Sequence, residues 1–137
     1  MADDIIFNKV AIIERCLKRI NEEYNGDSTN LRILTKQDSI VLNIQRACEA
    51  SIDLAMHMVA VKGLGIPQNS RDAFDMLVAH SLLEENLAVR LKAMVGFRNI
   101  AVHNYQELNI SVIEQIIKSN LRDLLYFAQV TLKNVNT

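Results

Sequence analysis

Apolar residues recur at spacings of three and four along almost the whole chain, and its 137 residues include only four glycines and one proline. Strict alternation of apolar and polar residues, the pattern of half-buried strands, is hard to find. We therefore expect an all-α fold. Amphipathic segments joined by short connections are typical of an up-and-down bundle of four to five helices. The length fits one domain, so we predict a single helical domain over residues 1–137.

Start and stop signals bound the two long helices expected in the first half of the chain. The first is expected over about 5–24 and ends at a loop that contains Gly26. The second is expected from Thr35 or Gln37 to Lys62, where a stretch with two glycines and the proline stops it. Its later part is apolar almost all round, which predicts that both a bundle neighbour and a second chain cover it.

Polar residues mark the beginnings of the later helices. Ser70 is expected to cap a short helix that ends near His80, and another helix is expected to begin near Glu84. Ser111 and Glu114 have the spacing of a capping box, in which two side chains bond to each other's backbone N–H groups. We expect this box to begin a final helix that continues almost to the end of the sequence.

Composition excludes several classes of protein. Half of the residues are apolar, so the chain can bury a core, and no apolar run approaches the ~18 residues of a membrane span. The N-terminus is acidic where a signal peptide would be basic, so we expect a cytoplasmic protein with no membrane partner. With 15 Lys plus Arg against 16 Asp plus Glu, any attraction for nucleic acid must be local, and we assign it to Arg90, Lys92 and Arg98.

The sequence indicates neither a metal site nor a cofactor. No His, Cys, Asp or Glu residues have the spacing of zinc ligands, and no glycine-rich loop precedes a helix as a phosphate site requires. Cys16 and Cys48 share no metal-type spacing and lie among apolar residues, so we expect buried, reduced thiols.

Reactive polar side chains gather in one segment, after an apolar helix and within eight residues: Arg98, Asn99, His103, Asn104 and Tyr105. A guanidinium carries a permanent charge whose geometry matches a phosphate, and an imidazole can give or take a proton near neutral pH. Together the two groups can cleave a phosphodiester without a metal, because one moves protons while the other stabilises charge on the phosphoryl oxygens. An amide does not titrate, so Asn99 is expected to hold the geometry.

Helix geometry constrains how Arg98 and His103 could act on one phosphate. On an uninterrupted helix, residues five apart point about 140° away from each other. Either the helix ends or bends between them, or the site is shared between chains. Attack by a ribose 2′-hydroxyl also needs both a base and an acid, whereas the segment has one imidazole. A two-fold dimer repeats the segment across its axis and supplies both, so we expect a homodimer.

The pattern Arg-x4-His-x-Tyr, filled by Arg98, His103 and Tyr105 with Asn99 after the arginine, resembles the signature of HEPN-domain proteins. It is most similar to that of HepT toxins from HepT/MNT toxin–antitoxin systems. The resemblance implies a homodimeric helical bundle and a metal-independent endoribonuclease cleft at the dimer interface, with Arg98 and His103 as its catalytic pair. It also implies a partner, a minimal nucleotidyltransferase (MNT) antitoxin that neutralises the toxin by transferring AMP from ATP to Tyr105.

Less specific readings of the same residues stay open. Arg98 could be a helix-end cation, His103 a capping or packing side chain, and Tyr105 an amphipathic side chain at a helix exit. His57 is expected to pack or to lie in an interface, and His80 to cap a helix C-terminus. The main alternative function is a non-catalytic helical partner subunit of a minimal nucleotidyltransferase. A purely structural dimerisation bundle is a third.

Overall fold

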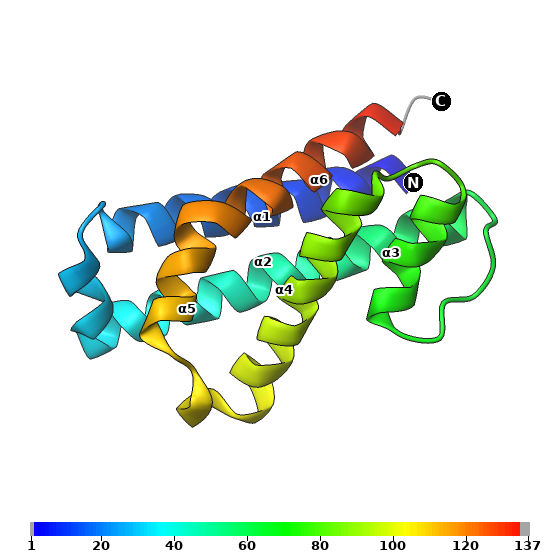
Figure 1. Cartoon of the computed structure of the whole chain (residues 1–137). Helices are drawn as coiled ribbons and strands as arrows, with labels where there is room; N and C mark the ends of the chain where they lie inside the picture. Colours follow the sequence, from blue (N-terminus) through cyan, green and yellow to red (C-terminus); the bar gives the residue numbers. More distant parts are fainter. Residues whose placement is uncertain (1, 135–137) are drawn as a thin grey trace.

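The protein is a bundle of α-helices, seen in a computed structural model that describes residues 2–134 (Figure 1). Within that range the chain forms no β-strand. The α-helices, in chain order, are α1 (Ala2–Tyr24), α2 (Leu34–Val61), α3 (Ser70–Ala79), α4 (Glu85–His103), α5 (Ile110–Gln115) and α6 (Leu121–Asn134). Two short 3-10 helices, η1 (Ser28–Arg32) and η2 (Tyr105–Glu107), lie in the connections after α1 and α4. The all-α prediction is therefore confirmed.

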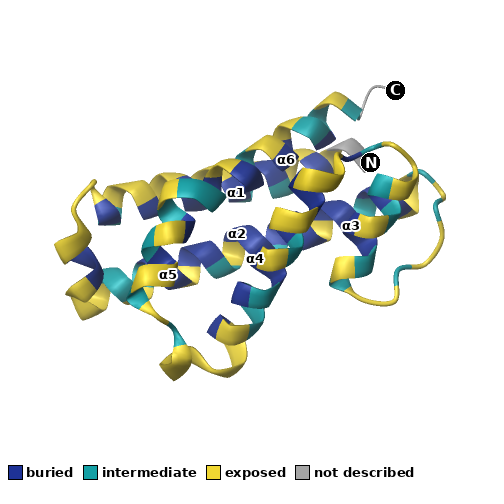
Figure 2. Cartoon of the chain, viewed as in Figure 1, coloured by how far each residue is buried: buried dark blue, intermediate teal, exposed yellow. Residues whose placement is uncertain are grey.

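The two longest helices, α1 and α2, lie side by side, and α6 packs against both (Figure 1). Helix α4 runs obliquely across α2, and the short α3 packs against α2 and α4. Buried residues lie on the inner faces of the helices, and exposed residues lie on the outer faces (Figure 2). This alternation of faces is what the spacing of apolar residues predicts for amphipathic helices.

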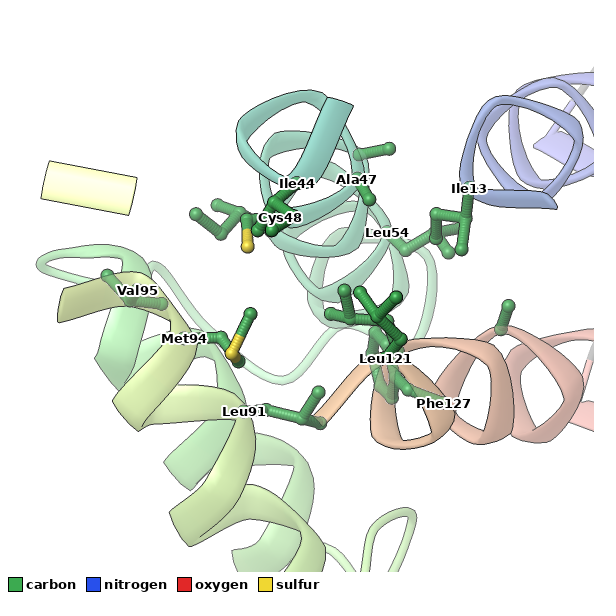
Figure 3. Packing of buried hydrophobic residues seen from close by; sticks show 14 of the residues in the cluster. Ile13, Ile44, Ala47, Cys48, Leu54, Leu91, Met94, Val95, Leu121 and Phe127 are labelled. Atoms are coloured by element: carbon green, nitrogen blue, oxygen red, sulfur yellow. The ribbon is translucent and has the colours of Figure 1, made fainter. Parts of the chain in front are cut away.

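The core is one connected cluster of buried apolar side chains. Side chains from α1, α2, α4 and α6 meet in it, among them Ile13, Leu54, Leu91 and Phe127 (Figure 3). Cys16 and Cys48 are buried free cysteines, as expected. Burial raises the pKa of the Cys48 thiol to about 12, because a thiolate loses its hydration in an apolar surrounding.

Turn geometry explains where the long helices end. Asn25 and Gly26 follow α1 with φ values of 51° and 68°, a left-handed conformation that favours asparagine and glycine. Gly63 and Gly65 after α2 also have positive φ, at 65° and 123°. The expected ends of the first two helices are therefore confirmed to within a residue or two.

Two of the expected capping residues are wrong. The side chain of Asn69, not Ser70, accepts the bond from Asp72 N–H that caps α3. At α5 the cap is Asn109, which accepts from Ser111 N–H. Each true cap is an asparagine one or two residues upstream of the predicted serine, and asparagine caps helices as well as serine does.

The predicted capping box fails because Glu114 has partners from another part of the chain. Its carboxylate accepts hydrogen bonds from the hydroxyls of Ser28 and Tyr24. These bonds, with that of Ser28 first, hold the pKa of Glu114 below its usual range. The carboxylate therefore ties the start of the last helical segment to the loop after α1.

The last helix is not regular. A π-helical turn over Ile116–Asn120 separates α5 from α6. The chain continues as one helical path through this turn, so counting α5 and α6 as one gives five helices, within the predicted four to five. Periodicity alone cannot reveal such a turn, because it inserts one residue without interrupting the apolar stripe.

Candidate functional site

The segment rich in polar side chains lies at the C-terminal end of α4. This helix is continuous through His103 and ends at Asn104, whose φ of −141° departs from helical geometry. The helix therefore does not end between Arg98 and His103. The two side chains point about 140° apart around its axis. One chain therefore holds the two side chains on different sides of α4.

Arg98 lies on the side of α4 that faces α2. It is half-buried, and its Nε donates a hydrogen bond to Asn99 Oδ1 at 3.0 Å. Its charge also acts on the Cys48 thiol of α2, where it opposes the increase in pKa that burial causes. Figure 3 shows Cys48 on the side of α2 that faces α4. The guanidinium is thus held at the boundary between the two helices, with Asn99 beside it.

His103 is the last residue of α4, and its side chain is exposed. Ile100 and Val102 precede it and are also exposed, at 41% and 47%. Ile100 also borders an apolar cavity of about 530 Å³, which is lined by Phe97 and other residues of α4 and by residues of α5 and the π-helical turn. Apolar surface and a free imidazole therefore lie together at this end of the helix.

Tyr105 begins η2, two residues after His103, and it is held by a residue far away in the sequence. Its hydroxyl donates a hydrogen bond to Asp38 Oδ1, near the start of α2, with a donor–acceptor distance of 2.5 Å. Burial raises the pKa of the phenol to about 12, with the hydrogen bond to Asp38 and the charge of Asp38 as further causes. The ring is still 40% exposed.

A small pocket of about 350 Å³ opens next to Tyr105. Gln37 and Val41 of α2 line one side of it, and Gln106 and Leu108 line another. Asp38 is not predicted from the sequence, because it lies 67 positions from Tyr105 and a single sequence carries no signal for such a contact.

Two of the cations expected to attract phosphate have a carboxylate partner. Arg90 Nε lies 3.0 Å from a carboxylate oxygen of Asp123 on α6, and Lys92 Nζ lies 2.7 Å from one of Asp75 on α3. That Arg90 and Lys92 attract phosphate stays a prediction. The tertiary fold supplies both carboxylates, and the pattern around α4 does not reveal them.

Arg71 of α3 lies against α4, a contact that is not predicted from the sequence. A Cβ at Gly96 would lie 3.1 Å from its Nη2, so the guanidinium rests directly on the backbone of α4 where a glycine leaves room. Within residues 2–134, neither Arg71 nor Arg98 has an ion-pair partner. These two cations, at the two sides of α4, remain available to an anion.

Residues 2–134 include no group of three or more His, Cys, Asp or Glu side chains that could hold a metal ion. Within the same range, no helix is both long and apolar enough to span a membrane. Among the histidines, His80 is the C-cap of α3, with its Nδ1 2.9 Å from the carbonyl oxygen of Met76, as expected.

An all-helical bundle with Arg-x4-His-x-Tyr at the end of one helix defines the protein as one of the HEPN class. The family model of HepT-like ribonucleases matches residues 13–131. The chain is also 48% identical, over 128 residues, to the mRNA nuclease HepT of Shewanella oneidensis, covering 93% of this chain and 96% of that protein. The chain therefore belongs to the HepT-like ribonuclease family.

Solved structures agree with this family. One is the tri-AMPylated HEPN toxin of Shewanella oneidensis in complex with an MNT antitoxin, at 48% identity and a TM-score of 0.87, covering 93% of this chain and 96% of that one. Another is a toxin–antitoxin complex with AMP-PNP, at 47% identity and a TM-score of 0.88, covering 93% and 98%.

Proposed function

We propose that this protein is the toxin of a HepT/MNT-type toxin–antitoxin system, an endoribonuclease that cuts RNA without a metal at a site built by two copies of the chain. The observation that carries the proposal is the Arg98–His103 pair at the end of α4, in a chain 48% identical to an mRNA nuclease. Its cytoplasmic location stays a prediction.

The chemistry follows from the two side chains. A neutral His103 takes the proton of a ribose 2′-hydroxyl, whose oxygen then attacks the adjacent phosphorus. The bond to the 5′-oxygen of the next nucleotide breaks, and a protonated His103 from the second copy gives that oxygen a proton. Arg98 stabilises the charge that develops on the phosphoryl oxygens, and Asn99 holds the guanidinium through its 3.0 Å hydrogen bond.

A homodimer fits the geometry of one chain in two ways. Arg98 and His103 point to different sides of α4, so a second copy is needed to bring a guanidinium and an imidazole to one phosphate. Exposed Ile100 and Val102 between them offer apolar surface that such a copy would cover. Arg71 and Arg98, which have no ion-pair partner in the described chain, supply the local positive charge that RNA requires.

Tyr105 is the proposed site of AMP transfer by the antitoxin. It is 40% exposed and follows His103 by two residues, so a nucleotide attached there adds bulk and negative charge next to the imidazole. Like charges repel, and the modified cleft would exclude the phosphates of RNA. The related toxin of Shewanella oneidensis, which is tri-AMPylated in its complex with an MNT antitoxin, supports this proposal.

The test is RNA cleavage by the purified protein in the presence of a metal chelator. We expect His103→Ala to lower the rate by about 10²- to 10⁴-fold, and Arg98→Ala to lower it by roughly 10²-fold or more. His80→Ala and Arg122→Ala remove the same side-chain types from exposed positions and should leave the rate unchanged. Folded His103 and Arg98 variants that still cut RNA would refute the assignment.

The same variants separate the toxin from the alternative of a non-catalytic partner subunit. A toxin slows growth when it is expressed without its antitoxin, and His103→Ala should remove that effect. A partner subunit that only completes a nucleotidyltransferase has no effect on growth when it is expressed alone.

A further inference from the structure

The bond between Tyr105 and Asp38 joins the proposed AMP acceptor to a carboxylate of the same chain. The phenol donates to Asp38 Oδ1 at 2.5 Å, and Asp38 is an exposed residue near the start of α2. Neither residue belongs to the Arg98–His103 pair. The arrangement places a proton acceptor in direct contact with the oxygen that would be modified.

A tyrosine that receives AMP must lose its proton. Its oxygen attacks the α-phosphorus of ATP, and a neutral phenol is a weak nucleophile. The pKa of Tyr105 is raised to about 12, first by burial and then by Asp38, so phenolate is scarce near neutral pH. The transfer therefore requires a group that takes the proton as the new bond forms.

Asp38 is the group in position to do this. Apart from Tyr105 itself, the residues that line the adjacent pocket are the amides Gln37 and Gln106 and apolar side chains, which do not take up protons. The charge of Asp38 is among the causes that raise the pKa of the phenol. A raised pKa and a contacting carboxylate fit a general base that works only when the phosphorus is attacked.

We propose that Asp38 is the general base for AMP transfer to Tyr105, so that the toxin itself supplies part of the chemistry of its own neutralisation. In this step a bond forms between Tyr105 Oη and the α-phosphorus of ATP. The bond from that phosphorus to the bridging oxygen breaks, pyrophosphate leaves, and the phenolic proton passes to Asp38 Oδ1. The inference rests on the proposed function, because it takes Tyr105 as the acceptor.

The experiment measures transfer of α-labelled AMP from ATP to the purified toxin by its partner nucleotidyltransferase. Asp38→Asn keeps an oxygen that can accept the phenol's hydrogen bond but cannot take up its proton, so we expect transfer to slow by 10²-fold or more. Asp53→Asn, which changes another exposed aspartate of α2, is the matched control and should transfer at the wild-type rate. Thermal unfolding checks that both variants are folded.

The pH profile separates a base from a residue that only positions the ring. With Asp38 as the base, the transfer rate should change little between pH 6 and pH 9. In Asp38→Asn the rate should rise about tenfold per pH unit, because phenolate formed by the solvent replaces the lost base. The role of Asp38 would be overturned if Asp38→Asn accepted AMP at the wild-type rate. It would also be overturned if transfer to this variant were slow but independent of pH.

A third variant separates this inference from the proposed function. Tyr105→Phe must lose the label. If it is still labelled, or if the wild type accepts no AMP, the acceptor assignment fails and the role of Asp38 fails with it. If Tyr105 carries the label and Asp38→Asn is labelled at the wild-type rate, only the inference about Asp38 fails.

Discussion

Two side chains, those of Cys48 and Tyr105, have a pKa raised to about 12. Their surroundings give them different roles. Cys48 is fully enclosed between α2 and α4, so its thiol is a packing group. Tyr105 is partly exposed and donates a hydrogen bond to a carboxylate. Burial alone makes a group inert, whereas burial with an adjacent proton acceptor leaves a reaction path open.

The titration of Tyr105 tests this arrangement directly. Its folded-state pKa is above the ordinary value of 10.0, so its contribution to stability is fully present below about pH 10 and is lost as pH rises toward about 12. In Asp38→Asn we expect the pKa to fall only part of the way, because burial, the largest cause, remains. Carbon-13 NMR of the tyrosine ring measures this pKa, and an unchanged titration would contradict the contact.

At the scale of single residues, the sequence predicts groupings of residues that are close together in the chain. Arg98, His103 and Tyr105 can be singled out because their chemical types fall within eight residues. The carboxylates that pair with Tyr105 and with the cations of α4 cannot be singled out in this way. Asp38 is 67 residues from Tyr105 and Asp123 is 33 residues from Arg90, and only the packing of helices brings each pair together.

The helices themselves follow from the sequence because their signals are strong and repeated. Apolar spacing fixes α1 and α2, and residues with positive φ fix their ends. The final helical segment departs from prediction because Glu114 bonds to Tyr24 and Ser28 instead of capping its own helix. Tertiary contacts thus override a local capping signal where a side chain can reach a distant partner as well as the backbone of its own helix.

Packing of α3 and α6 depends on an aromatic pair. The rings of Phe74 and Phe127 meet edge to face, with centroids 5.5 Å apart and planes at 64°, and both side chains are about 1% exposed. Phe127→Ala should lower the free energy of unfolding by about 3–5 kcal/mol. Its neighbour Tyr126 is 53% exposed, so Tyr126→Ala should change stability by no more than about 0.5 kcal/mol. Equal losses in urea unfolding would contradict the assigned core.

At the scale of the whole molecule, the bundle places a rigid core next to an incomplete site. Helix α4 is anchored by buried residues along much of its length, while its last turn carries an exposed imidazole and exposed apolar side chains. Arg98 faces α2, and His103 points away from it by about 140° around the helix. The fold of one chain therefore holds two halves of the proposed site, and a second copy is required to join them.

Mixing the wild type with one inactive variant tests this requirement most directly. One cleft of the proposed mechanism uses His103 of both copies, one as base and one as acid, so a dimer with a single His103 lacks a group that transfers protons. We predict that co-refolding equal amounts of wild type and His103→Ala leaves about a quarter of the cleavage rate of the same amount of wild type, because about a quarter of the dimers have both imidazoles. A mixture that forms mixed dimers but keeps about half of that rate, as chains with a complete site each would, would contradict the shared site.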